Sequence, residues 1–485
     1  MSFALVVSRH ALRASLAALA LLGLVIALPS PVLAEEPVGG LAFTRAGHLP
    51  VPAAETFQPW RRSTPATKSD PGLDADGVKM QPRPDGKWYD HPVGQASYGL
   101  RSLNTWRQTG DAFFLQRALA NADRLLDRRL EARGAWWYPY GFDFQLRDSD
   151  VVMTAPWYSG MAQGEALSLF SQLASALPPE SSSAAEAYRT AAELTFRSLT
   201  LGPEAQPWVS MVDGEGYLWV QEYPQEPSTE SDFTYNGYGF VALGLWDYWR
   251  LTGSAEASAY LDGAVTTLAR YQPVVRNPGW ASGYSLRNPW PHVNYHVIHT
   301  DQLLQLSWLT GQRALAGLSD ELFLDYPARS QRGTVIFAPG THELYRFGAD
   351  GAITGRRSLV TTRTTSAPTM ARVRIHHRGI HYRITGGPFL DWYAVEVPRR
   401  SWLRGIRLER QYAPSRPAVL AAGRAVSFVA FDSSGRESGR RTWTPTQPTT
   451  VAVNRMAVIN GMLCLRVSAG TFAGRWFVHS AAHLD

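Results

Sequence analysis

Cysteine is almost absent from this chain, since Cys464 is the only one among 485 residues. A single thiol excludes an intrachain disulfide, so the fold must be held by its core, which a chain of this length can supply. Lysine occurs only at positions 68, 79 and 87, and every other permanently basic side chain is arginine. Arginine suits carboxylate and sulfate partners. The net charge of +6 is nevertheless too small to indicate a polyanion by itself, and no nucleic-acid partner is expected.

Long apolar runs are missing beyond the N-terminus, which excludes a membrane span in the rest of the chain. At the start, Arg9 and Arg13 precede the apolar run 16–28. Small residues follow at a cleavage position in 32–34. This pattern predicts an export signal over residues 1–34, and hence a secreted, extracellular protein, which is cell-wall associated if its later modules bind the wall. An uncleaved anchor is the alternative, disfavoured because the run is short. Loss of the two arginines lowers the charge to about +4.

Residues 35–84 are rich in Pro, Ala, Thr and Gly with little periodicity, which predicts a linker or arm. Helical runs then recur roughly every 60 to 75 residues, each followed by a second apolar helical stripe. They begin near residues 95, 163, 237 and 301. Four helical hairpins in series predict an α/α toroid, an incomplete (α/α) barrel, over residues 85–328. An ordinary helical array is the alternative.

Three of these runs end alike, in the motifs WRQTG, WRLTG and WLTG. Their final residues, Gly110, Gly253 and Gly311, fit a left-handed helix C-cap, with the tryptophan packed one turn earlier. The second run ends instead in two prolines.

From about residue 329 the pattern changes to alternating Arg, Thr, Val and aromatic residues with turn signals, which predicts β-structure. This part is duplicated: FGADGAITGRRSL (347–359) resembles FDSSGRESGRRTW (431–443), and RITGGPFLDWYAV (383–395) resembles RVSAGTFAGRWFV (466–478). The duplication predicts two small barrel-like modules, 329–410 and 411–485. Binding to cell wall or glycan is the functional interpretation, and a passive appendage is the alternative.

Three loops dense in Tyr, Trp, Pro and His lie beside the helical runs, as expected of a sugar-binding cleft on a helical scaffold. They are APWYSGMAQGEA (155–166), WVQEYPQEPSTESDFTYNGYGFVALGLWD (219–247) and SGYSLRNPWPHVNYHVIH (282–299). In order, spacing and rare aromatics they resemble the C-terminal catalytic region of the D-glucuronyl C5-epimerases, enzymes of heparin and heparan-sulfate type glycosaminoglycan modification. The resemblance covers about residues 150 to 312, and it is compatible with a homodimer because the family dimerises.

The resemblance implies inversion at C5 of a uronic acid within an acidic, heparosan-like polysaccharide, glucuronate becoming iduronate, without a metal or other cofactor. The C5 proton is weakly acidic because its removal places a second negative charge beside the carboxylate. Such a site must neutralise that carboxylate. It also needs two acid/base groups on opposite faces of the sugar ring.

By the same resemblance, Tyr223, Tyr284 and Tyr295 correspond to the family's tyrosines, Arg287 to its substrate-binding arginine and Glu222 to the acid before the first tyrosine. We expect Tyr295 and either Glu222 or Tyr223 to flank C5, while Arg287 and Tyr284 hold the carboxylate. A tyrosine with its ordinary pKa near 10 is a poor base, but an arginine beside it would favour the phenolate.

Several further residues are predicted to contact substrate, and some of them also have a purely structural explanation. Asn236 reads first as a helix N-cap. Trp157 and Tyr158 form either a sugar-stacking platform or wall packing. The remaining assigned contacts are Gln163, His296 and His299, the two histidines also being expected to orient tyrosines. The spacing of His292, His296 and His299 suggests a metal site, but this is disfavoured because the only nearby acid is Asp301.

The chain departs from the family in its domain order, and three other functions are alternatives to the epimerase. The animal enzymes carry β-domains ahead of the helical region, whereas this chain has a short arm there and β-modules after it. A polysaccharide lyase would remove the same proton and then expel the 4-linked sugar. An inverting glycosidase would need two opposed carboxylates, and no pair is singled out. The last rival is a glycan-binding protein without activity.

Overall fold

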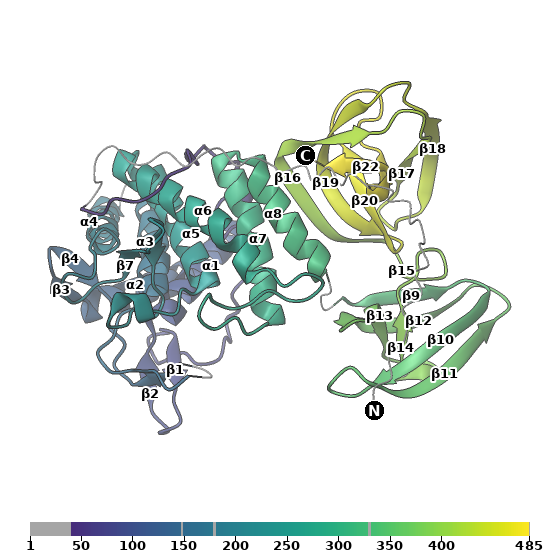
Figure 1. Cartoon of the computed structure of the whole chain (residues 1–485). Helices are drawn as coiled ribbons and strands as arrows, with labels where there is room; N and C mark the ends of the chain where they lie inside the picture. The colour runs from purple at the N-terminus through teal and green to yellow at the C-terminus, as the bar shows by residue number, and fades with distance from the viewer. Residues whose placement is uncertain (1–39, 147–148, 178–180, 328–330, 485) are drawn as a thin grey trace, which may run out of the picture. The chain divides into compact units, whose positions relative to one another are not determined.

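The computed structural model describes residues 40–146, 149–177, 181–327 and 331–484, so the predicted export signal (1–34) lies outside the described residues. Within them, eight α-helices form four consecutive hairpins (Figure 1). Their bounds are α1 (Pro92–Thr109), α2 (Ala112–Arg128), α3 (Gly160–Ala176), α4 (Ser182–Ser198), α5 (Tyr235–Thr252), α6 (Ala255–Val275), α7 (Val293–Thr310) and α8 (Arg313–Asp325).

The three predicted C-cap glycines are confirmed. Gly110, Gly253 and Gly311 end α1, α5 and α7 with φ of 70°, 69° and 69°, a left-handed conformation that costs glycine little. The start of α7 was predicted wrongly. It begins at Val293 and not near residue 301, because the helix starts directly after the extended His292, and Asn294 lies inside its first turn.

The odd-numbered helices pack in series, α1 on α3, α3 on α5 and α5 on α7, and each contacts its even-numbered hairpin partner. Glycines allow the closest of these approaches. A Cβ on Gly164 would lie 2.6 Å from the Val241 Cα, and one on Gly244 would lie 2.1 Å from the Gly164 carbonyl oxygen. The result is the predicted α/α toroid, with large aromatic and aliphatic side chains buried between the helices.

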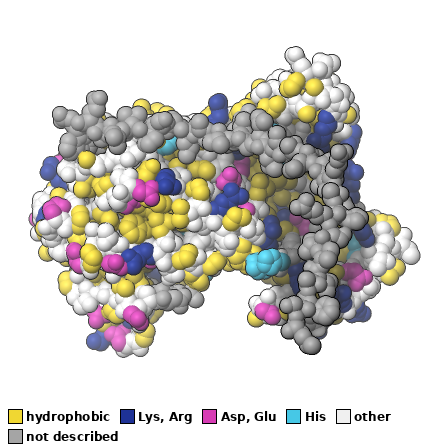
Figure 2. Space-filling model, in the orientation of Figure 1, with side chains coloured by type: hydrophobic (Ala, Val, Ile, Leu, Met, Phe, Trp, Pro, Cys, Tyr) yellow, Lys and Arg dark blue, Asp and Glu magenta, His cyan; other side chains and the backbone are white. Residues whose placement is uncertain are grey.

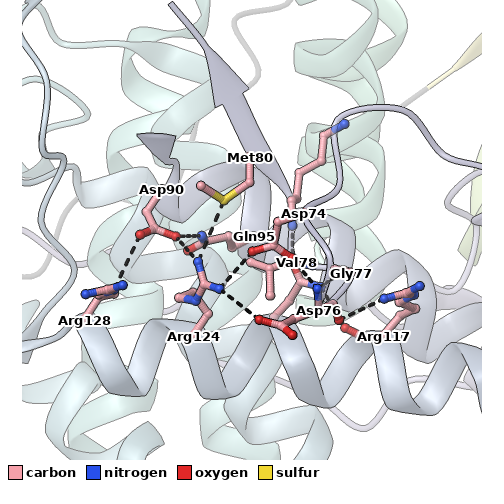
Figure 3. Close-up of polar contacts among 12 residues, drawn as sticks. Asp74, Asp76, Gly77, Val78, Met80, Asp90, Gln95, Arg117, Arg124 and Arg128 are labelled. Atoms are coloured by element: carbon pink, nitrogen blue, oxygen red, sulfur yellow. Dashed lines mark hydrogen bonds and ion pairs between the residues drawn. The ribbon is translucent and has the colours of Figure 1, made fainter. Parts of the chain in front are cut away.

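The segment predicted as a linker or arm packs against this helical domain. Three successive backbone N–H groups at residues 46–48 donate to the carboxylate of Asp262 on α6. Farther along, Arg124 of α2 donates to Asp74 at 2.8 Å and to Asp90 at 2.9 Å (Figure 3). The hairpin of β1 (Met80–Pro82) and β2 (Trp88–Asp90) leads from the arm into α1.

Short hairpins occupy the connections that lead into α3 and α5. They are β3 (Leu130–Ala132) with β4 (Ala135–Trp137), β5 (Phe144–Gln145) with β6 (Val152–Met153), and β7 (Ser210–Val212) with β8 (Leu218–Val220). The connection into α7 is irregular. These connections carry the three aromatic loops.

Two seven-stranded antiparallel sheets follow, which confirms the tandem β-rich repeat. The first contains β9 (Gly333–Phe337), β10 (Gly340–Phe347), β11 (Ile353–Thr361), β12 (Thr365–Ile375), β13 (Gly379–Ile384), β14 (Tyr393–Val395) and β15 (Ser401–Leu403). The second contains β16 (Ile406–Leu420), β17 (Val426–Phe431), β18 (Glu437–Trp443), β19 (Thr449–Ile459), β20 (Met462–Val467), β21 (Trp476–Val478) and β22 (Ala482–Leu484).

The strand orders are β11-β10-β14-β13-β12-β9-β15 and β18-β17-β21-β20-β19-β16-β22, so every strand of one sheet corresponds to the strand seven places later. In the described residues these orders are open, with no pairing of the two edge strands. The predicted boundary at 410/411 needs correction. Ile406 already pairs with Ile459, so β16 belongs to the second sheet from its first residue.

No described helix has the length and apolar character needed to cross a bilayer. On the face drawn in Figure 2, hydrophobic atoms are plentiful over the helical part, with acidic and basic side chains scattered among them.

Candidate active site

The aromatic loops before α5 and α7, together with the β5–β6 hairpin, enclose a cavity of about 650 Å³. Tyr223, Tyr284, Tyr295 and Arg287 all line it, so the structure brings together four of the predicted residues. Additional lining comes from aromatic, imidazole and acidic side chains. These are Phe144, Trp290, His292, Glu230 and Asp232.

The three tyrosines come from three different supports. Tyr223 follows β8, Tyr284 lies in the loop before α7, and Tyr295 is in the first turn of α7. The backbone of Tyr284 is held at both ends, since its N–H donates to the Trp290 carbonyl at 3.0 Å and its carbonyl accepts from the Tyr235 N–H at 3.3 Å. Its ring centroid lies 4.6 Å from that of Tyr295, and its phenol is hydrogen-bonded to that of Tyr223.

Burial raises the pKa of Tyr223 well above its ordinary value, and the neighbouring Glu222 raises it further. Burial and Glu222 also raise the pKa of Tyr284. The expectation that a nearby arginine favours the phenolate is therefore wrong for these two residues, because desolvation disfavours the charged form more than a cation at the cavity mouth favours it. Both are held as neutral phenols, which are proton donors.

Glu222 is buried behind Tyr223. Its carboxyl occupies the space that a side chain at position 237 would take, since a Cβ on Gly237 would lie 2.3 Å from the Glu222 Oε2. Burial raises the pKa of Glu222 to about 7, against a lowering by the hydrogen bond with Tyr223. Glu222 lines a separate cavity of about 200 Å³, whose wall it shares with Tyr223. Of the two predicted partners for Tyr295, only Tyr223 thus lines the same cavity as Tyr295.

A second buried carboxyl, Glu165 on α3, was not among the predicted residues. It is 1% exposed and accepts a hydrogen bond from Ser97 of α1. Burial raises its pKa to about 8, and Glu222 raises it further. The available signal was an acid on the inward face of an apolar helix, in the stretch QGEALSLF.

Arg287 is neutralised at the mouth of the cavity. Its Nη2 lies 2.5 Å from Glu230 Oε2, and its Nη1 donates to the Thr229 carbonyl at 3.0 Å. Asp232 lines the cavity as well; burial raises its pKa, and Arg287 lowers it. Glu230 and Asp232 were also missed by the sequence analysis, although both stand in the STESD stretch of the second aromatic loop.

The histidines of α7 are buried beneath the cavity rather than lining it. Ser282 donates its N–H to Nδ1 of His296 at 2.9 Å, and its hydroxyl bonds Nδ1 of His299 at 2.9 Å. The Nε2 of His296 lies 2.9 Å from the Leu322 carbonyl. Because Ser282 stands two residues before Tyr284, the pair supports the tyrosine loop. Direct substrate contact by His296 and His299 does not fit this burial.

His292 differs from them, since it lines the cavity and precedes α7 as its N-cap residue. Burial lowers the pKa of His299 to about 3, so that ring is neutral. Among the described residues no three His, Cys, Asp or Glu side chains group as a metal site would require.

Two further assignments need correction. Asn236 is not an N-cap, because α5 begins at Tyr235 with Thr234 as the cap residue. Gln163 is fully buried and uses its amide within the fold. Its Nε2 donates to the Trp136 carbonyl and to Ser198, and its Oε1 accepts from the Tyr138 N–H. A side chain with its hydrogen-bonding capacity already used in the core does not contact substrate.

Trp157 and Tyr158 lie beside the cavity of about 650 Å³ that Tyr223, Tyr284 and Tyr295 line, which is called the tyrosine cavity below. Trp157 stacks on Tyr140 with ring centroids 3.8 Å apart and approaches Tyr223 at 6.0 Å. Both residues line a neighbouring cavity of about 470 Å³, which shares Gln225 with the tyrosine cavity. Trp157 is therefore buried wall packing, and Tyr158 is half-buried beside it.

The sequence model of the D-glucuronyl C5-epimerase C-terminus family matches residues 131–321. These residues carry all three aromatic loops and the four predicted residues of the cavity. Residues 131–321, which are similar to this family, are called the epimerase-family segment below. The epimerase-family segment runs from β3 to α8 and leaves the arm and both sheets outside the match.

Solved structures similar to this chain include a D-mannose isomerase (12% identity, 52% of this chain and 65% of that chain, TM-score 0.37). The GH76 alpha-mannanase of Bacteroides thetaiotaomicron matches at 9% identity (51% and 61%, TM-score 0.34). The unsaturated glucuronyl hydrolase of Bacillus sp. GL1, described as responsible for the degradation of glycosaminoglycan, matches at 15% identity (48% and 61%, TM-score 0.33). The chain spans less than two thirds of the length of each.

Proposed function

We propose that this protein is a carbohydrate-active isomerase that inverts C5 of a uronic acid within an acidic polysaccharide, turning glucuronate into iduronate in a heparosan-like polymer. The observation that carries the proposal is one cavity lined by Tyr223, Tyr284, Tyr295 and Arg287 within the epimerase-family segment. The cavity offers a cation for the carboxylate and phenols for proton transfer, the two provisions that the reaction demands.

In the proposed reaction, Arg287 binds the uronate carboxylate after exchanging its contact with Glu230. Tyr295, as the phenolate, takes the C5 proton, and the electron pair moves into the carboxylate, where Arg287 stabilises the enolate-like intermediate. Tyr223 then donates its phenolic proton to the opposite face of C5. One C–H bond breaks and one forms, so substrate and product are isomers. Tyr223 suits the donor role because its raised pKa keeps it neutral.

Glu222 and Tyr284 complete this proposal without touching C5. The phenol of Tyr284 and the carboxyl of Glu222 are both hydrogen-bonded to Tyr223. After each turnover the proton that Tyr295 has taken returns to Tyr223 through Tyr284, whose ring centroid lies 4.6 Å from that of Tyr295. Glu222 exchanges a proton with Tyr223 and is suited to this exchange because its pKa of about 7 lets it hold or release a proton near neutrality.

The test is a reaction in deuterated water with the full chain and a heparosan-type polymer. Deuterium at C5 with intact chain length supports the epimerase. An unsaturated uronate with chain shortening would instead make the protein a lyase. Tyr295→Phe should reduce deuterium exchange by about 10²-fold or more, since it removes a proton-transfer group. Tyr271→Phe is the matched control, because that phenol bonds Asp213 away from the cavity. Full activity in Y295F would end the assignment of Tyr295.

The location of the protein, its oligomeric state and the role of its two sheets are also proposals. The export signal suggests that the protein works outside the cell, and the family's dimerisation suggests a homodimer. The two sheets are proposed to contact cell wall or glycan.

A further inference from the structure

The second sheet contains a cavity of about 760 Å³ that lies outside the epimerase-family segment. Its lining is unevenly charged, with four arginines and one acid. These are Arg399, Arg424, Arg436, Arg440 and Glu437. Its remaining lining is largely apolar and includes Phe431, Met462 and Trp476.

Only one of these arginines is neutralised. Arg440 holds Glu437 through two contacts, Nε to Oε1 at 2.9 Å and Nη2 to Oε2 at 2.6 Å. Within the described part of the chain, the guanidinium groups of Arg424 and Arg436 have no hydrogen bond or ion pair, and both side chains are exposed. The charge of Arg436 interacts with Asp432 of the same hairpin, but neither guanidinium group is engaged in a hydrogen bond or ion pair. Two such groups beside an apolar wall are suited to an anion carried on a partly apolar ring.

We propose that this arginine cavity is a second binding site for the acidic polysaccharide, in which Arg424 and Arg436 bind uronate carboxylates and the Trp476 wall contacts the sugar rings. The choice of a uronate ligand rests on the proposed function. The anion site itself rests on the charges and the cavity. A second site holds the polymer while the tyrosine cavity releases one unit and takes the next, which raises the local concentration of substrate.

The first sheet provides an internal comparison, because the two hairpins that follow β10 and β17 have the same register. Phe347 pairs with Ile353 in the first and Phe431 pairs with Glu437 in the second, each next to a bulge at the same place. This equivalence puts Ala352 where the second sheet has Arg436. The arginine at this hairpin position is therefore specific to the second repeat, and the inference predicts uronate binding at this hairpin and not at the corresponding hairpin of the first sheet.

The experiment measures binding of a heparosan-type polymer to the full chain by calorimetry, at low and at physiological salt. The background is Arg287→Gln, which weakens carboxylate binding in the tyrosine cavity. In that background the double variant R424Q/R436Q should lose affinity by about tenfold or more, because two charge-assisted contacts disappear. The matched control changes two exposed arginines of the first sheet, R356Q/R363Q, and should stay within about twofold, as surface changes away from a site usually do.

Each outcome decides the proposal. Unchanged affinity in R424Q/R436Q overturns it, and so does an equal loss in the control pair, which would mean attraction by net charge. Binding of a neutral glucan that falls in the same variant also overturns it. Failure of the proposed function is distinguishable, because a chain that binds the polymer through Arg424 and Arg436 yet incorporates no deuterium keeps the site and loses the epimerase.

Discussion

The tyrosine cavity of the helical domain and the arginine cavity of the second sheet differ in whether their arginine side chains are paired with acids. In the tyrosine cavity the cation Arg287 is paired with Glu230, and buried acids and phenols surround the space. In the arginine cavity two exposed guanidinium groups have no hydrogen bond or ion pair within the described residues. A site that only holds an anion can leave its cations open, whereas a site that moves protons needs neutral, desolvated donors.

This difference has an energetic reason. Burial raises the pKa of an acid by disfavouring its charged form. This effect acts on Tyr223 and Tyr284 in the tyrosine cavity, and on Glu222 in the small cavity beside it. Exposure leaves arginine charged and hydrated, which is sufficient for attraction but gives no acid/base chemistry. The division of work between the two cavities can be tested by changing the charge in each.

The largest expected effect follows from removing the cation of the tyrosine cavity. Arg287→Gln should lower kcat/KM for deuterium exchange about 10²- to 10³-fold, the usual cost of losing one group that stabilises a developing oxyanion. Steady-state kinetics on a short uronate oligosaccharide measures it, and R424Q/R436Q is the matched control on the same substrate. An R287Q enzyme with wild-type kcat/KM would show that another group neutralises the carboxylate.

A smaller effect concerns the buried acid behind the cavity. Glu165 has a pKa of about 8 in the folded protein, against an ordinary value of 4.5. Between those values the folded state holds a proton that the unfolded state has released, so the free energy of unfolding falls as the pH rises from about 5 to about 8. Glu165→Gln cannot ionise and should reduce this fall by about 2 kcal/mol or more.

Urea unfolding of the wild type and of E165Q at pH 5 and pH 8 makes the measurement. Glu193→Gln on α4 is a control, because that side chain is exposed and its change should leave the pH dependence as it is. An unaltered fall in E165Q would mean that other groups, with Asp247 and its pKa of about 7 the first candidate, carry the pH dependence.

The sequence predicted the fold class because its signals were local. C-cap glycines, the recurring hairpins and the duplicated β-segments each depend on nearby residues, and all are seen in the structure. Local signals failed at the beginning of α7, where the helical run was expected near residue 301 although the helix begins at Val293. They failed again for Asn236, because a cap is decided by where the backbone turns helical, and the cap residue Thr234 stands two residues before the asparagine.

The site was predicted in its tyrosines and Arg287 but not in what surrounds them. Sequence separation hides that Glu165 of α3 meets Ser97 of α1, or that Ser282 is shared by His296 and His299. The family resemblance predicted which residues belong to the site, but it could not show which of their side chains face the cavity and which are buried in the core. Gln163 shows this, since only the packed structure reveals that its amide is used in the core.

The smallest expected effect would make the tyrosine cavity resemble the arginine cavity. Glu230→Gln releases Arg287 from its ion pair, so an incoming carboxylate no longer displaces an acid. The pair is about half exposed on both sides, and such pairs contribute about 0 to 1 kcal/mol. KM for a short uronate oligosaccharide should therefore fall by up to about fivefold at low salt, with kcat little changed, and the gain should shrink at high salt. Asp391→Gln, which breaks the exposed pair with Arg383 on the first sheet, is the matched control and should leave KM unaltered. A higher KM in E230Q would mean that Glu230 positions Arg287 for substrate instead of competing with it.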